Sequence, residues 1–137
     1  MNQVQIIDKV AFIYIKNNKL LSARSINKTA FYTPGGKREK NESDIECLTR
    51  ELKEELNVDF IAISANHYGD FQAHAHGKDM SIVVKMKCYF GEFKGELLPS
   101  SEIEEIKWLD SNDIGKDYTS KVDWLILAQL KVDGKIL

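Results

Sequence analysis

The sequence predicts an α/β fold, in which a sheet of several strands packs against two helices. Several segments are rich in β-branched and aromatic residues or alternate between apolar and polar residues, as strands do. Two other segments place apolar residues three or four positions apart, behind a residue suited to capping a helix. The chain has 137 residues, which is the length of one domain, and we expect residues 1–137 to form it.

The strands are expected in two groups along the chain. Near the beginning, Val4–Lys16 and Lys19–Arg24 form a hairpin, because Asn17 and Asn18 tolerate the positive φ that a tight turn needs. Later strands are expected at Asp59–Ala65, Met80–Phe93 and Ile106–Leu109. The segments predicted to be loops or turns are Ser25–Thr33, Pro34–Gly36, Asn66–Asp79, Phe93–Ser101 and Asp110–Asp113.

Both helices are indicated by their first residues and by an apolar stripe. Ser43 and Glu46 form a capping box, so the first helix is expected to begin at Ser43. Thr119 or Ser120 caps the second helix, which is expected to end near Lys131. The residues expected to pack are Ile45, Leu48, Leu52 and Leu56 in the first helix and Val122, Leu125, Ile126 and Gln129–Leu130 in the second.

Composition and charge argue against several classes of protein. The formal net charge is −2 and the pI is about 5.9, whereas nonspecific binding to nucleic acid needs a basic face, so we expect no nucleic-acid partner. No apolar run approaches the roughly 18 residues of a membrane span, and the N-terminus lacks the pattern of a signal peptide. Cys47 and Cys88 form no C-x-x-C pair. These observations favour a cytoplasmic protein with reduced thiols and no membrane partner.

The first predicted helix carries the most informative group of residues. Glu51, Glu54 and Glu55 stand at positions i, i+3 and i+4, so their side chains project from one face. Like charges at this spacing destabilise a helix, which suggests that a cation normally lies beside them. Mg²⁺ fits best, because it binds few carboxylates and shares the rest of its coordination shell with water and substrate phosphate.

This stretch resembles the Nudix box, the signature of the Nudix hydrolase family. The family pattern is Gly, five residues, Glu, seven residues, Arg-Glu, an aliphatic residue, any residue, Glu-Glu, any residue, Gly and an aliphatic residue. The chain departs from it at Asn57, where the family has glycine at the end of the helix. Asparagine is the best substitute there, since it tolerates the left-handed conformation. The matching residues are Gly36, Glu42, Arg50, Glu51, Leu52, Glu54, Glu55 and Val58.

The resemblance implies the Nudix fold, a mixed β-sheet sandwiched between α-helices. It also implies hydrolysis of a nucleoside diphosphate linked to another group, with Mg²⁺ or Mn²⁺ as the cofactor. In this family pattern Glu54 and Glu55 are the primary metal ligands, and Glu51 is a ligand, the general base or both. A backbone carbonyl of Gly35 or Gly36 completes the metal shell.

Further residues of the site are expected on the same grounds. Arg50 and Glu42 hold the geometry of the box. A glutamate outside the helix can supply an additional ligand or base, and the candidates are Glu92, Glu96 and Glu102, of which we include Glu102 in the metal site.

Contacts to the substrate are expected from five residues. Arg24 and Lys37 can contact phosphate oxygens, Tyr32 and Phe71 can stack on a base, and Asn112 can pair with a purine edge. Each has an alternative interpretation. The two basic residues can be surface charges, the aromatic residues can belong to the core, and Asn112 can serve its own turn.

The substrate class is inferred by elimination. The chain lacks the proline, the tyrosine and the additional motif typical of relatives that hydrolyse ADP-ribose, diadenosine polyphosphates and NADH, respectively. We therefore expect a (deoxy)nucleoside triphosphate, including oxidised forms such as 8-oxo-dGTP, to be hydrolysed to the monophosphate and pyrophosphate. The alternatives are ADP-ribose, a nucleotide sugar or a dinucleotide as substrate, or a nucleotide-binding sensor without activity. Apolar edge strands are compatible with a homodimer.

Overall fold

The protein is described here by a computed structural model, which covers residues 4–75 and 80–137. One sheet has four strands in the order β4 (Gly35–Lys37), β1 (Gln5–Ile13), β6 (Ile82–Lys94) and β5 (Asp59–His74). It is mixed, because β1 pairs with β6 in parallel and with β4 antiparallel. A second, antiparallel sheet has the order β2 (Ile15–Lys16), β3 (Lys19–Ser25) and β7 (Ile103–Leu109).

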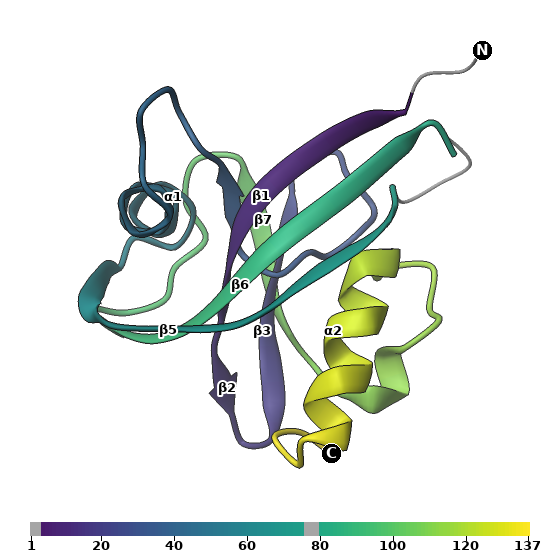
Figure 1. Ribbon diagram of the computed structural model, residues 1–137. Coiled ribbons are helices and arrows are strands. Elements are labelled where there is room, and N and C mark those ends of the chain that lie inside the picture. The colour runs from purple at the N-terminus through teal and green to yellow at the C-terminus, as the bar shows by residue number, and fades with distance from the viewer. Residues whose placement is uncertain (1–3, 76–79) are drawn as a thin grey trace.

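The two helices, α1 (Asp44–Leu56) and α2 (Lys121–Val132), lie on opposite sides of the strands (Figure 1). The predicted mixed sheet between helices is therefore confirmed. No helix in the described part of the chain is long and apolar enough to cross a membrane.

Strand β1 separates two hydrophobic cores. Because side chains alternate along a strand, Val10 and Phe12 pack in the core beneath α1, whereas Ala11 and Ile13 pack in the core beneath α2. All four are buried. Strand β1 thus contributes to both halves of the molecule.

Helix α1 begins and ends as its sequence predicts. The Ser43 side chain accepts a hydrogen bond from the amide of Glu46, and the Glu46 side chain accepts one from the amide of Ser43. At the other end, Asn57 adopts the left-handed conformation, with φ 59° and ψ 33°, and its amide donates to the carbonyl of Lys53. The substitution of asparagine for the usual glycine therefore keeps the helix end that the glycine would make.

Strand β5 is much longer than expected. The predicted loop Asn66–Asp79 is wrong as far as His74, because the strand runs from Asp59 to His74. Its second half includes Tyr68 and Phe71, which pack against the core beneath α2, and two irregularities in its pairing with β6 disturb the alternation of its side chains. The end of the predicted loop, residues 76–79, lies outside the described residues.

Other elements differ in smaller ways. The predicted strand Val4–Lys16 is divided at Tyr14 into β1 and β2, and β7 begins at Ile103 rather than Ile106. Asp110 caps a short 3-10 helix, Ser111–Asp113, in place of the predicted turn.

In α2, which Ser120 caps, Leu125 is 46% exposed and Asp123 is buried instead. The expected packing of Leu125 is thus wrong.

Candidate active site

The loop before α1 is fastened to the helix by the guanidinium group of Arg50. Its Nε and Nη2 atoms donate to the two carboxylate oxygens of Glu42, at 2.8 and 2.9 Å. Nη2 also donates to the backbone carbonyl of Lys37 at 3.0 Å, and Nη1 donates to Glu51 at 2.8 Å. The hydrogen bonds from Arg50 lower the pKa of Glu42 to about 2, so this carboxylate stays charged and bound. Arg50 therefore fixes the loop and one of the acidic side chains together.

The acidic trio lies where α1 meets β4. The carboxylate of Glu55 accepts a hydrogen bond of 2.9 Å from the amide of Gly35. At Gly36 there is no room for a side chain, because a Cβ atom would lie 2.4 Å from the carboxylate carbon of Glu51. Glu54 is more open, with 53% of its side chain exposed, and its carboxylate lies 3.5 Å from Arg50. The glycines thus let the backbone approach two of the three glutamates closely.

An acidic pocket of about 380 Å³ is lined by these three glutamates and by Glu102, together with Ser25, Ser101 and Ile103. Glu102 comes from the segment just before β7, so the pocket joins α1 to an element far away in the sequence. Glu92 and Glu96 do not line it. The structure therefore brings together four of the predicted metal-site glutamates and separates them from the other two candidates.

Burial raises the pKa of two of these carboxylates, Glu55 and Glu51. It raises the pKa of Glu55 to about 7, against the hydrogen bond from Gly35, and the charges of Glu51 and Glu54 add to the rise. Burial also raises the pKa of Glu51, although Arg50 opposes the change. Carboxylates that repel one another in a shielded pocket are stabilised by a bound cation.

The donor set fits a hard divalent cation. All four side chains offer oxygen atoms, and Mg²⁺ and Mn²⁺ favour oxygen ligands. Within residues 4–75 and 80–137, no group of three or more His, Cys, Asp or Glu side chains is close enough together to hold a metal ion without rearrangement. Glu51 and Glu54 are instead held partly by Arg50. The residues present would therefore offer oxygen ligands to a hard divalent cation, with Arg50 holding two of the carboxylates beside its site.

A cleft of about 360 Å³ adjoins the acidic pocket, and the two share Ser25, Glu55 and Ile103. Its walls are mainly apolar and come from the α2 side of β1 and β6 and from residues 28–35. Tyr32 lies in the wall, and the Nζ atom of Lys9 lies 4.6 Å from the centre of its ring. A mostly apolar cleft with a few polar groups is typical of a small-molecule site.

Behind this cleft lies a buried carboxyl group that the sequence did not single out. Asp123 is 0% exposed, and its Oδ1 accepts hydrogen bonds from the Thr33 hydroxyl at 2.9 Å and the Thr33 amide at 3.3 Å. Its Oδ2 is also buried and has no hydrogen-bond partner among the described residues. Burial raises the pKa of Asp123 to about 7. Asp123 thus connects α2 to the segment that leads into Gly35.

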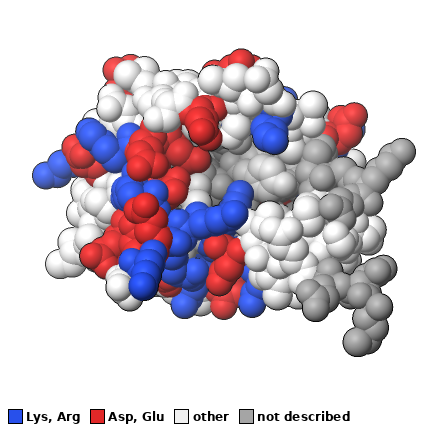
Figure 2. Space-filling view, turned by 90° about the horizontal axis from the view of Figure 1, so that it is seen from above, with Lys and Arg blue, Asp and Glu red and all other residues white. Residues whose placement is uncertain are grey.

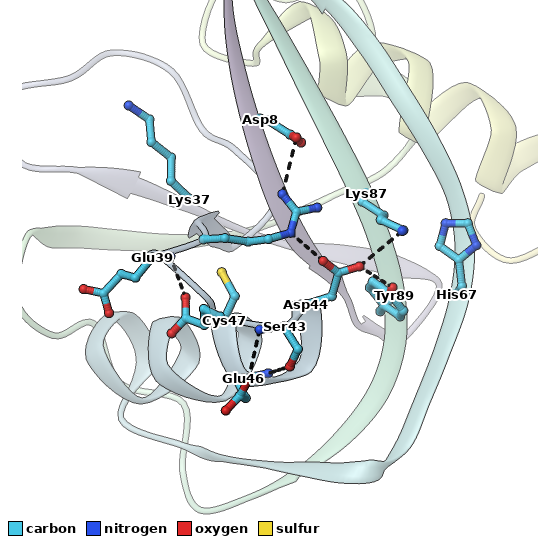
Figure 3. A network of polar contacts seen from close by, with 12 residues as sticks. Asp8, Lys37, Glu39, Ser43, Asp44, Glu46, Cys47, His67, Lys87 and Tyr89 are labelled. Atoms are coloured by element: carbon cyan, nitrogen blue, oxygen red, sulfur yellow. Dashed lines mark hydrogen bonds and ion pairs between the residues drawn. The ribbon is translucent and has the colours of Figure 1, made fainter.

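Of the five residues predicted to contact substrate, only Tyr32 lines the cleft. Arg24 is paired with Glu104 and Glu105, at 2.6 and 3.1 Å. Lys37 is exposed and points away from the neighbouring polar network (Figure 3).

Phe71 packs beside Tyr68 and lines a different, charged hollow. Asn112 lies in the 3-10 helix Ser111–Asp113, where its backbone N–H donates to the Asp110 carboxylate. The structure does not bring Phe71 or Asn112 to the cleft.

A second polar network holds the first turn of α1 against the sheet (Figure 3). The Asp44 carboxylate accepts hydrogen bonds from Arg38 Nε at 2.5 Å and from the Tyr89 hydroxyl at 2.6 Å, and Lys87 lies 3.3 Å away. Burial opposes its charge, but these contacts hold the pKa of Asp44 at about 2. In the view of Figure 2, acidic and basic side chains are interspersed over the side of the molecule that carries α1.

Comparison with known proteins agrees with this geometry. The family model of the NUDIX domain matches residues 7–130. The mRNA-decapping protein D10 of Fowlpox virus (strain NVSL) is 36% identical over 104 residues, which cover 69% of this chain and 46% of that protein. The m7GpppN-mRNA hydrolase of Saccharomyces cerevisiae is 29% identical over 124 residues, which cover 88% of this chain and 12% of that protein. The chain therefore spans less than half the length of these relatives.

Solved structures share the fold. The MutT protein from Methanosarcina mazei Go1 superposes with a TM-score of 0.73 at 18% identity, covering 96% of this chain and 97% of that one. The E. coli ORF135 protein gives a TM-score of 0.71 at 22% identity, covering 95% and 94%.

Proposed function

This chain belongs to the NUDIX domain family, and we propose that it is a Mg²⁺- or Mn²⁺-dependent pyrophosphohydrolase that converts a nucleoside triphosphate to its monophosphate and pyrophosphate. The observation that carries the proposal is that the mainly apolar cleft and the acidic pocket lie side by side and share lining residues. The mainly apolar cleft can take a nucleoside, and the acidic pocket beside it can take its phosphates together with a cation. Oxidised nucleotides such as 8-oxo-dGTP belong to the same substrate class.

The residues have separable roles in this proposal. Glu51, Glu54 and Glu55 would hold the cation, with a backbone carbonyl of Gly35 or Gly36. When bound, the cation neutralises phosphate charge and lowers the pKa of a bound water. Arg50, through Glu42, keeps the loop and the helix in register and thereby positions the three glutamates.

The reaction also needs a group that accepts a proton. As the oxygen of water bonds to phosphorus, the bridging P–O bond breaks and a carboxylate takes the proton of the water. Glu51 and Glu102 are the candidates for this general base, because both line the acidic pocket.

A second candidate function is hydrolysis of capped RNA. It is favoured by the 36% identity to the fowlpox mRNA-decapping protein D10. The overall composition does not favour this function, because a chain with a net charge of −2 has no general attraction for the phosphates of RNA.

The test is a panel of substrates with Mg²⁺ or Mn²⁺. It would contain normal and oxidised nucleoside triphosphates, ADP-ribose, nucleotide sugars, dinucleoside polyphosphates and a capped RNA, with release of phosphate or pyrophosphate as the readout. We expect turnover of triphosphates, and a loss of about 100-fold or more in Glu54→Gln, since even residues behind the metal ligands commonly contribute 10- to 100-fold. The mostly exposed Glu54 can be changed without disturbing the core.

Glu96→Gln is the matched control, because it removes the same charge from an exposed position outside the pocket. Full activity in Glu54→Gln would contradict the site. Turnover of capped RNA but not of triphosphates would select the second candidate.

A further inference from the structure

We propose that Lys9 makes the cleft selective for nucleotides with an uncharged base and against N7-methylated purines, whose ring is cationic. The inference rests on the proposed function in one respect only, namely that the cleft receives the nucleoside. It goes further by naming the residue that separates the two candidate substrates. The cap named in the description of the yeast relative, m7GpppN, carries such a methylated base.

Lys9 brings a positive charge into the cleft. It lies on β1 and lines the cleft between the apolar walls, so its ammonium group is largely removed from solvent. No carboxylate of the described residues lies within 4.0 Å of its Nζ atom. Burial lowers the pKa of the Lys9 amine, while the charges of Glu55 and Asp123 oppose this from farther away, so Lys9 is a cation at a slightly acidic pH. A ligand in the cleft therefore meets a cation that has no close ion-pair partner among the described residues.

The described lining of the cleft offers little aromatic surface. Proteins bind cationic rings and quaternary ammonium groups by enclosing them with the faces of aromatic side chains. Among the described residues, Tyr32 is the one aromatic residue that lines the cleft, and Lys9 lies over its ring at 4.6 Å. The cation–π position that a methylated purine would need is thus already taken by the protein itself.

The described walls of the cleft carry more positive than negative charge. The described lining contains two lysines, Lys9 and Lys28, and a single carboxylate, Glu55, which the proposed function assigns to the metal. Asp123 lies behind the wall rather than in it, its Oδ1 is bonded to Thr33, and burial keeps its pKa near 7. No free carboxylate of the described lining is left to compensate a cationic base.

Binding of nucleoside monophosphates tests this inference without turnover. We would measure the Kd of GMP and of 7-methyl-GMP by calorimetry, at a slightly acidic pH where the methylated ring keeps its full charge. The wild-type protein should prefer GMP by about tenfold, which corresponds to about 1.4 kcal/mol. In Lys9→Met the preference should fall to less than about threefold, whereas Lys9→Arg, which keeps the charge, should retain it.

Lys94→Met is the control, because Lys94 is exposed and does not line the cleft. It should leave the ratio of the two Kd values unchanged. Thermal unfolding of each variant would establish that the fold is intact, and Lys9→Arg keeps the test decisive if Lys9→Met does not fold.

Hydrolysis of GTP and 7-methyl-GTP with Mg²⁺ gives an independent readout of the same ratio. Equal affinity for the two monophosphates, an unchanged ratio in Lys9→Met, or binding of neither monophosphate by the folded protein would overturn the inference. A preference for GMP in a protein that hydrolyses no nucleoside triphosphate of the panel would support the inference while refuting the proposed activity.

Discussion

Replacing Asp123 by asparagine should change how the stability of the protein depends on pH. Asparagine has nearly the same shape as the carboxyl group, and its side-chain oxygen can accept the two hydrogen bonds from Thr33. The difference is that asparagine never ionises. The substitution therefore removes one titration from the folded and the unfolded protein.

The size of the effect follows from the burial of Asp123. Its pKa rises from 3.8 to about 7 on folding, because burial penalises the charged form more than Thr33 stabilises it. Below pH 3.8 the group is protonated in both states. As the pH rises to about 7, the unfolded chain releases this proton and the folded protein retains it, so the free energy of unfolding falls. The fall amounts to about 4 kcal/mol, at about 1.36 kcal/mol for each tenfold change in proton affinity.

Urea unfolding of both proteins between pH 4 and pH 8, followed by tryptophan fluorescence, measures this effect. The stability of Asp123→Asn relative to the wild type should increase by about 4 kcal/mol across this range and level off above pH 7. The depressed pKa values of Glu42 and Asp44 affect both proteins equally, so they cancel in the difference. A difference that stays constant with pH would refute the conclusion that Asp123 is buried with a raised pKa.

Two further substitutions test the C-terminal end of α1 and the glycine beside Glu51. Asn57→Gly should raise the free energy of unfolding by about 0.5 kcal/mol, because glycine adopts the left-handed conformation more readily, and thermal melting together with unchanged turnover would show it. Gly36→Ala should reduce kcat by about tenfold or more, because the new Cβ atom would push the Glu51 carboxylate out of place, and a 1 Å displacement in a site can have larger effects. Steady-state kinetics would measure this loss, and normal kcat in Gly36→Ala would show that the position of Glu51 is unimportant.

The parts of the fold predicted well are those with local signals. The start of α1 depends on Ser43 and Glu46, and its end depends on Asn57, all within one turn of the positions that they define. The proximity of Glu51, Glu54 and Glu55 likewise follows from helical spacing. The close approach of Gly36 to Glu51 also agrees with the Nudix-box pattern, which sets a fixed number of residues between this glycine and this glutamate.

The parts predicted poorly depend on contacts between distant segments. The second half of β5 looks polar, and only the core beneath α2 gives Tyr68 and Phe71 a surface to pack against. Lys9 in a strand and Asp123 in a helix each resemble ordinary surface residues in the sequence. They become part of one region only because β1 and α2, from opposite ends of the chain, approach the segment around Thr33.

The double role of β1 has a consequence for folding cooperativity. Since Val10 and Phe12 complete one core while Ala11 and Ile13 complete the other, displacement of β1 itself would expose apolar surface in both cores at once. Unfolding of β1 is therefore penalised in both cores, and the domain should behave as a single cooperative unit. Loss of β1 would remove one wall of the cleft together with the strand that holds Gly35 and Gly36 beside the acidic pocket.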